Sequence, residues 1–419
     1  YRALSTEDEH GKNVAIGQDA LLFQNAGADA FNVAIGYNAG NDITSGVQNT
    51  IMGGLAGDAL TTGQYNTAIG YLALSTEDTG DQNVAIGRAA LMTLNYDGDG
   101  NNVAVGNNAG ASATTAIQST FIGAFSGDAV TTGLANTAIG YNALSGEDEH
   151  GYNTAVGHGA LKVQNAGADA YNVAVGASAG LSVTTGVQNV IVGGLAADAL
   201  TTGGGNVALG DRALSAEDTG NYSIAVGYRA LQQQNNNDNN YNIAVGADAG
   251  RSINSGIYNV IIGGLAGDAI TSGTRNVAIG LNALGSEDTG SHNVAIGHNA
   301  LKTADAGADA YNVAVGSSAG TAVTTGQFNT LIGGLVGDSL TSGAHNVAVG
   351  YNALASEDAH GRNIAIGTNA LTTLDAGADA YNVAIGHNAG LSVTTGADNT
   401  ILGGLAGDAL TTGGRNTVL

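Results

Sequence analysis

The sequence predicts an all-β protein, a parallel β-solenoid of about 24 coils, each about 17–19 residues long. The first observation is a pentapeptide, Asn13-Val-Ala-Ile-Gly17, whose variants begin at 24 positions and end with a truncated copy at Asn416. Its first residue is Asn in every copy except those at Ser119 and Ser223, and its fifth is Gly in all 23 complete copies. A repeat this short cannot bury a core alone, so its copies are expected to stack as equivalent coils.

The second observation is a longer period. The first pentapeptides start at positions 13, 32, 49, 66 and 83, so their spacings are 19, 17, 17 and 17, and this 70-residue cycle of four coils recurs six times. We therefore expect residues 1–419 to form one continuous repeat array, although a chain of this length usually divides into several domains. Because both ends cut through a coil, we expect the array to be truncated at both ends and to belong to a longer polypeptide.

The third observation is composition. The chain has 68 Gly and no Pro, which suits a backbone whose N–H groups are needed in hydrogen-bonded ladders. Each pentapeptide is expected to form a strand, its Gly to begin a tight turn, and the Ala-containing stretch that follows, such as Ala73-Leu74, to begin a second short strand. Differences in coil length fall in the second turn, and helices should be nearly absent.

The pentapeptide alternates with the period of a strand. Positions two and four carry aliphatic or Thr side chains, as at Val14 and Ile16, whereas positions one, three and five carry small groups, as at Ala15. Neither face is charged, so we expect the small-residue face to be covered by an identical chain. In one coil of four the residue at position three is bulky, and we call these residues the packing layer. We expect Phe121 of this layer to contact other chains near a common axis. The layer comprises Ile51, Phe121, Ile191, Ile261, Leu331 and Ile401.

The Asn at position one forms a column in such a stack. Identical amides on successive rungs can hydrogen bond to one another, as in the Asn ladders of cross-β structures. We expect these side chains to be buried and bonded to neighbouring coils. The representative members of this structural ladder are Asn32, Asn49, Asn66, Asn102, Asn172, Asn242, Asn312 and Asn382.

Charge and cysteine content exclude several classes of function. The 35 acidic against 11 basic residues give a net charge of −24, which disfavours nucleic acids and anionic membranes as partners. No apolar run is as long as a membrane-spanning helix needs, so no membrane insertion is expected. Because Cys is absent, neither a disulfide nor a thiolate metal site exists.

No catalytic constellation recurs along the repeats, so we expect no enzyme activity. His10, His150 and His360 share one loop phase, but the other three copies have Gly there, which argues against a repeat-wide zinc site. Acidic turns offer the oxygen ligands that Ca²⁺ takes, and the candidate ligands are Asp58, Asp128, Asp268 and Asp408. Turn formation also explains these Asp residues, and the short Gly- and Asp-rich repeat of calcium-binding β-rolls is missing. The sequence therefore assigns no cofactor and leaves Ca²⁺ as an alternative.

The run Asn136-Thr-Ala-Ile-Gly-Tyr-Asn-Ala-Leu144 resembles two related families of repeats. One is the head of trimeric autotransporter adhesins, and the other is the shaft of bacteriophage tail fibres. Thr61-Thr62-Gly63 before Asn66 is closer to the phage form, and the coils are longer than is usual in adhesin heads. The resemblance covers essentially the whole chain. It implies a left-handed β-roll and a homotrimeric fibre.

The predicted function is therefore that of a structural and adhesive fibre. The shaft of a phage tail fibre or similar virion appendage would space a receptor-binding tip from its base. Its partners would be identical chains, and a cell-surface receptor or glycan bound through regions outside this chain. A bacterial trimeric surface adhesin or extracellular filament is the alternative, and a calcium-binding repeat module is a third. Each implies an extracellular location, on a virion or a cell surface.

Overall fold

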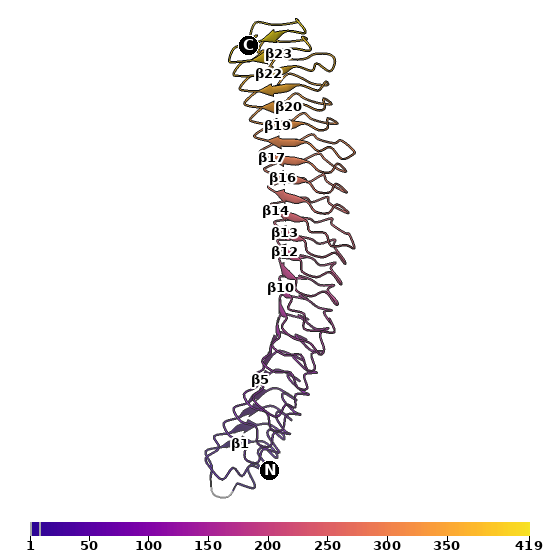
Figure 1. Cartoon of the computed structure of the whole chain (residues 1–419). Coiled ribbons are helices and arrows are strands. Elements are labelled where there is room, and N and C mark those ends of the chain that lie inside the picture. Colours follow the sequence, from indigo (N-terminus) through magenta and orange to yellow (C-terminus); the bar gives the residue numbers. More distant parts are fainter. Residues whose placement is uncertain (1, 8–9) are drawn as a thin grey trace. The chain divides into compact units, whose positions relative to one another are not determined.

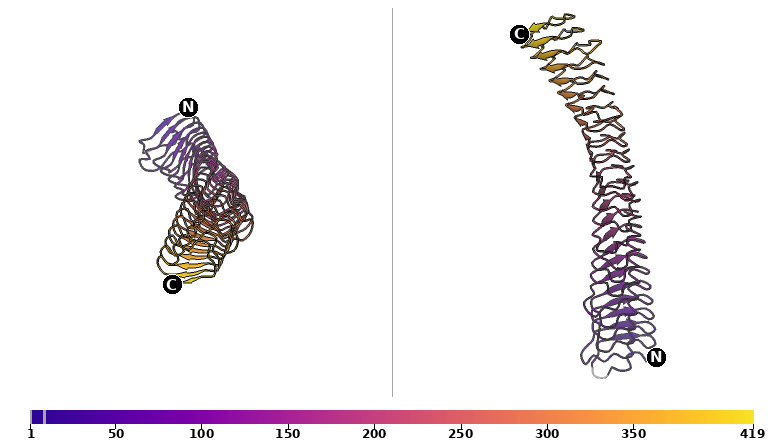
Figure 2. Two further views of the ribbon diagram at one scale, coloured as in Figure 1. Left: turned by 90° about the horizontal axis from the view of Figure 1, so that it is seen from above. Right: turned by 45° about the vertical axis from the view of Figure 1, so that its right-hand side comes forward.

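The computed structural model describes residues 2–7 and 10–419 and confirms the β-solenoid. These residues form 24 short parallel strands and no helix. Contacts divide the chain into two units, Tyr1–Asn206 and Val207–Leu419. Within each unit the coils stack on one another, and each coil contributes one strand to the same side of its stack (Figures 1 and 2).

Every strand except the last spans three residues, positions two to four of the pentapeptide. The strands of the first unit are β1 (Val14–Ile16), β2 (Val33–Ile35), β3 (Thr50–Met52), β4 (Thr67–Ile69), β5 (Val84–Ile86), β6 (Val103–Val105), β7 (Thr120–Ile122), β8 (Thr137–Ile139), β9 (Thr154–Val156), β10 (Val173–Val175) and β11 (Val190–Val192). Those of the second unit are β12 (Val207–Leu209), β13 (Ile224–Val226), β14 (Ile243–Val245), β15 (Val260–Ile262), β16 (Val277–Ile279), β17 (Val294–Ile296), β18 (Val313–Val315), β19 (Thr330–Ile332), β20 (Val347–Val349), β21 (Ile364–Ile366), β22 (Val383–Ile385), β23 (Thr400–Leu402) and β24 (Thr417–Val418).

Neighbouring strands pair in the register of the repeat. In β2 and β3, for example, Ala34 lies opposite Ile51, so that position three meets position three. The same holds for β15 and β16, where Ile261 lies opposite Ala278. Each position of the pentapeptide therefore forms a column of equivalent residues along its unit.

Each coil has one strand, and the expectation of a second strand is wrong. The stretch 70–74 consists of turns, in which Leu72 and Leu74 adopt left-handed φ values of 59° and 52°. These residues cannot continue an extended strand, yet they keep the ladder intact, because the Leu74 N–H donates to the carbonyl of Ala90 on the next coil at 3.0 Å. The inter-coil hydrogen bonds thus continue beyond the strands.

The Gly at position five is required by both conformation and space. Gly53 has a φ of 137°, and a Cβ atom there would lie 2.5 Å from the carbonyl oxygen of Gly70, the equivalent residue on the next coil. Any side chain would therefore force successive coils apart. This accounts for a Gly in every complete copy.

The two strand faces are arranged opposite to our expectation. Position three, as at Ala34 and Ala68, is fully buried inside the coil. Positions two and four point outward, and Val33 and Ile35 on either side of Ala34 are half-buried. The interior is narrow: in the coil of Ala68 it also holds the buried Ala73 and Leu74, so only a small group fits at position three of such a coil.

The packing layer also faces the interior of its own coil. All six of its members are fully buried in the single chain, so Phe121 does not contact another chain as expected. The coil that contains Ile51 has Gly57 at the position that Leu74 occupies in the next coil, and a Cβ atom on Gly57 would lie 3.1 Å from Ile51 Cδ1. A large residue at position three therefore replaces a Leu elsewhere in the coil, which keeps the interior filled.

Candidate assembly surface and acidic loops

The outer face of the strands is apolar and uncharged along both units. All 24 residues at position two are Val, Ile or Thr, and all 24 at position four are Ile, Val, Leu or Met. Many are more than a third exposed, including Val190 at 37%, Ile262 at 37% and Ile332 at 40%. We call this surface the strand face. A solvated sheet face normally carries polar side chains, so an uncharged apolar face marks an interaction surface.

A column of mostly exposed aromatic and cationic side chains precedes the strands of the second unit. It is formed by the residue immediately before position one, and the rings stack nearly parallel at centroid distances of 4.6–5.8 Å. Arg275 lies over the ring of Tyr258 at 5.4 Å, which adds a cation–π contact. Because the faces of these rings are covered by their neighbours, ring edges form the surface. Its aromatic members include Tyr222, Tyr241, Tyr258, His292, Tyr311, Phe328 and His345.

The Asn ladder is buried and joins the coils, as expected. Oδ1 of Asn32 accepts the backbone N–H of Asn49 at 2.8 Å, and its Nδ2 donates to the carbonyl of Gly46 at 2.8 Å. The other ladder residues make the same two kinds of hydrogen bond. Each Oδ1 accepts the backbone N–H of the next residue in the column, and each Nδ2 donates to a carbonyl in the turn that precedes that next residue. These residues are Asn49, Asn66, Asn102, Asn172, Asn242, Asn312 and Asn382. The amide-to-backbone pairing ties each strand to the second turn of its coil and to the strand of the next.

A buried Glu in the acidic loops was missed by the sequence analysis. Glu77 and its equivalents Glu147, Glu217, Glu287 and Glu357 are fully buried. Oε1 of Glu77 accepts the N–H of Gly80 at 2.7 Å, and Oε2 accepts the N–H of Tyr96 on the next coil at 3.2 Å. The carboxylate therefore holds its own turn and the neighbouring loop together. The available signal was the Glu-Asp pair that stands at this phase in all six repeats, but the pair alone does not show which of its two residues is buried.

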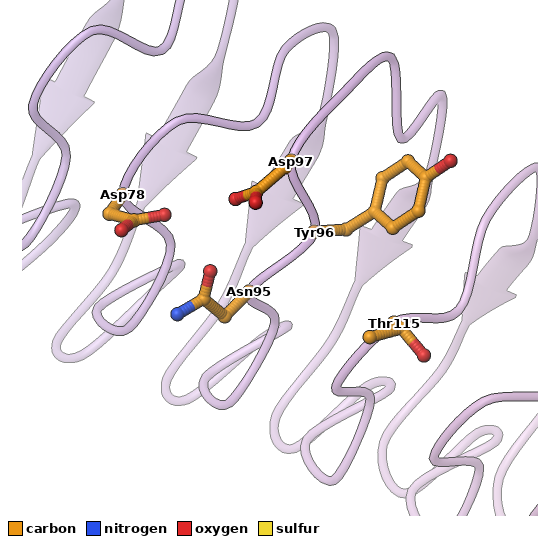
Figure 3. Close-up of a pocket in the computed structure, with 5 residues that line it drawn as sticks. All are labelled: Asp78, Asn95, Tyr96, Asp97 and Thr115. Atoms are coloured by element: carbon orange, nitrogen blue, oxygen red, sulfur yellow. The ribbon is translucent and has the colours of Figure 1, made fainter.

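Beside this Glu the loops form an open polar cavity. It has a volume of about 520 Å³ and is lined by Asp78, Asn95, Tyr96, Asp97 and Thr115. Figure 3 shows Asn95 and Asp97 directed toward the coil of Asp78, whereas the Tyr96 ring points the other way. Asp97 is held there by the hydroxyl of Thr79, which donates to its Oδ1 at 2.8 Å. An equivalent cavity of about 480 Å³ in the second unit is lined by Asp218, Asn235, Asn236, Asn237, Asn254 and Ser255.

Side chains that could hold a metal ion gather only at these loops within the described residues. Three trios bring one ligand atom from each member within 4.8 Å of the others: Glu147, Asp148 and His150; Glu357, Asp358 and His360; and Glu287, Asp288 and Asp305. None includes the candidates Asp58, Asp128, Asp268 or Asp408. The first three of these candidates are half-buried, and Asp408 is exposed. Burial raises the pKa of Asp58, Asp128 and Asp268.

The buried Glu predicts a pH dependence of stability. Burial raises the pKa of Glu147 from 4.5 to about 7, although the N–H and the charge of His150 oppose the rise. Between these pH values the folded chain binds more protons than the unfolded chain, so the free energy of unfolding falls as pH increases and levels off above the folded-state pKa. Burial acts in the same direction on the pKa of Glu77, Glu287 and Glu357.

We therefore expect Glu147→Gln to flatten this part of the pH dependence, because Gln keeps one acceptor oxygen and has no charge to bury. The measurement is urea unfolding at intervals from pH 4.5 to 8 in the presence of a chelator. Glu149→Gln, two positions away on an exposed side chain, is the control. Equal slopes for the wild type and Glu147→Gln would contradict the assignment.

Comparison with known proteins adds no relative: no protein-family model matches the chain, and no curated protein shows significant similarity to it. The described residues contain no helix able to cross a membrane.

Proposed function

We propose that this chain is the shaft of an extracellular fibre, a phage tail fibre or similar virion appendage, in which three parallel copies associate through their strand faces. The observation that carries the proposal is the strand face itself, uncharged over every coil and partly exposed in the single chain. An identical chain is the partner it fits best, because its columns repeat with the same spacing and the same apolar character.

The size of the strand face supports this partner. Fully burying an aliphatic side chain stabilises a protein by about 1.5–3 kcal/mol, which at about 25 cal/mol per Å² corresponds to ~60–120 Å² of apolar surface. A side chain that is one-third exposed therefore leaves roughly 20–40 Å² of this surface in contact with water. The second unit has 13 strands, β12–β24, with two strand-face side chains in each coil; those of Ile224, Ile262, Ile332, Ile385 and Leu402 are 37–40% exposed, and most of the others are half-buried. The strand face therefore exposes an apolar strip of a few hundred Å² in all, a size at which the surface patches of proteins are often interaction sites.

Charge is placed consistently with this assembly. The acidic residues lie in the turns, such as Asp78, Asp97 and Asp305, and none lies at positions two or four of a strand. Copies packed through their strand faces would keep the charge of −24 per chain on the solvated loops, where salt screens it. Like charge would also oppose lateral association through the loops.

Introducing positive charge into the strand face tests the proposal. In Ile262→Lys/Ile332→Lys, two exposed strand-face residues become cationic, and association would have to bury both charges. We expect the wild type to have the mass of a trimer in dilute solution and this variant the mass of a monomer, with an unchanged circular dichroism spectrum. Mass is measured by analytical ultracentrifugation.

The matched control is Ala308→Lys/Ala378→Lys, which places the same two charges on exposed loops and should leave the trimer intact. A folded wild-type monomer would contradict the proposed assembly. The same assembly would also suit a bacterial surface adhesin. Labelling with an antibody against this chain distinguishes the two functions: a phage shaft predicts labelled virion tails, and a surface adhesin predicts labelled cell surfaces.

A further inference from the structure

The acidic loops of successive coils bring side chains of the same phase together in three of the 70-residue repeats. The trio Glu287, Asp288 and Asp305 is equivalent to Glu77, Asp78 and Asn95, of which the last two line the cavity in Figure 3. The cavity lined by Asp218 and Asn235 lies at the same phase of its repeat. Two cavities and one carboxylate trio therefore mark a single structural position.

The ligands of the trio come from two successive coils. Glu287 and Asp288 belong to the turn that follows β16, and Asp305 belongs to the long loop of the next coil, after β17. One carboxylate oxygen from each lies within 4.8 Å of the other two. A cation bound among them would link two successive coils, as the Glu77 carboxylate does through its backbone hydrogen bonds.

The trio contains a buried oxygen without a hydrogen-bond partner of ordinary geometry. Glu287 is fully buried, and its Oε1 accepts the N–H of Gly290 at 2.7 Å. Its Oε2 is buried and has no such partner, whereas the equivalent Oε2 of Glu77 accepts the N–H of Tyr96. An ionised carboxylate oxygen left in this way is costly unless a cation or donor meets it.

The electrostatics of the trio also favour a cation. The carboxylates of Asp305 and Asp288 lie close enough to the buried carboxylate of Glu287 to repel it, and the N–H groups of Gly290 and Ala306 are the donors near it. Within the described chain no Lys, Arg or His forms an ion pair with any of the three residues. Three carboxylates are thus gathered without a compensating charge.

We propose that Glu287, Asp288 and Asp305 form a calcium site that joins two coils of the second unit. Oxygen is the only ligand atom that the three side chains offer, and Ca²⁺ is bound by oxygen ligands at about 2.3–2.6 Å. Two ligands of one Ca²⁺ ion are at most about 4.6–5.2 Å apart, and the three oxygens of the trio, which all lie within 4.8 Å of one another, are compatible with that limit. Mg²⁺ usually keeps several waters and takes only one or two protein carboxylates, and zinc sites use mainly Cys and His.

The test is calcium titration of the full chain after chelation and dialysis, followed by calorimetry. We expect Asp288→Asn/Asp305→Asn to remove one binding site or to weaken it at least tenfold. Asn occupies the position of Asp305 in four of the six repeats, so the fold tolerates it there. Circular dichroism confirms that the variant is folded.

The matched control is Asp268→Asn, which changes a half-buried Asp of the same unit that belongs to no trio and should leave calcium binding unchanged. Three results would overturn the site: no heat at millimolar Ca²⁺, equal titrations for the wild type and Asp288→Asn/Asp305→Asn, or equal affinity for Mg²⁺. The site is independent of the proposed assembly, because its ligands come from one chain. A monomeric wild type that binds calcium would therefore retain the site and reject only the trimer.

Discussion

Phe121→Ala is expected to destabilise the coils around β7 by about 3–5 kcal/mol, the usual cost of removing a large buried aromatic side chain. Phe121 is the largest fully buried side chain of the described residues, and its ring occupies space left by two glycines. A Cβ atom on Gly110 would lie 2.6 Å from its Cδ2, and one on Gly127 would also clash with the ring. With Gly on both sides, no side chain at these two positions can move in to fill the cavity.

Phe121→Ile is the matched control, because Ile occupies this position in four other repeats, as at Ile51. It should cost clearly less than Phe121→Ala. Because each coil contacts only its neighbours, the loss should be local, and hydrogen exchange of peptides from the segment 100–145 measures it better than a global melting temperature. Uniform loss of protection along the chain, or equal effects of the two substitutions, would contradict this account.

The repeat period predicts the stack and the register, because identical residues at a fixed spacing form columns when their coils stack. It does not determine which strand face is interior, because both faces of the pentapeptide are uncharged. The structure decides this through the size of the coil: Ala68 shares the interior with Leu74, whereas Ile51 shares it with Gly57. The sequence alone does not reveal this relation, because other coils, such as that of Ala34 with Gly40, combine a small residue at position three with Gly at the Leu position.

The acidic loops show where local rules fail. A Glu-Asp pair in a turn is usually solvated, and nothing local distinguishes Glu287 from Asp288. Only the stacking of coils buries Glu287 and brings Asp305, which belongs to the next coil, beside it. Contacts between loops of successive coils depend on loop conformation, including left-handed residues such as Leu284, that residue periodicity does not reveal.

Asn172→Leu is expected to cost about 3–9 kcal/mol, because it leaves three buried polar groups unpaired at about 1–3 kcal/mol each. Oδ1 of Asn172 accepts the N–H of Asn189 at 2.8 Å. Its Nδ2 donates to Oε1 of Gln164 and to the carbonyl of Gly186, each at 2.8 Å. Leu can satisfy none of these groups, and because it is larger than Asn at a fully buried position, overpacking adds to the loss.

Asn172→Ser tests whether the loss of stability comes from the lost hydrogen bonds or from any substitution in the Asn column. Ser occupies position one at Ser119, where its hydroxyl accepts the N–H of Asn136 at 3.2 Å, so Ser keeps the acceptor of the ladder. We expect the loss of stability in urea unfolding to be largest for Asn172→Leu and intermediate for Asn172→Ser. A Leu variant as stable as the wild type would show that neighbouring turns rearrange to satisfy the freed groups. The Asn column would then set the register of the coils without stabilising them, and its repetition in 22 of 24 copies would need a different physical cause.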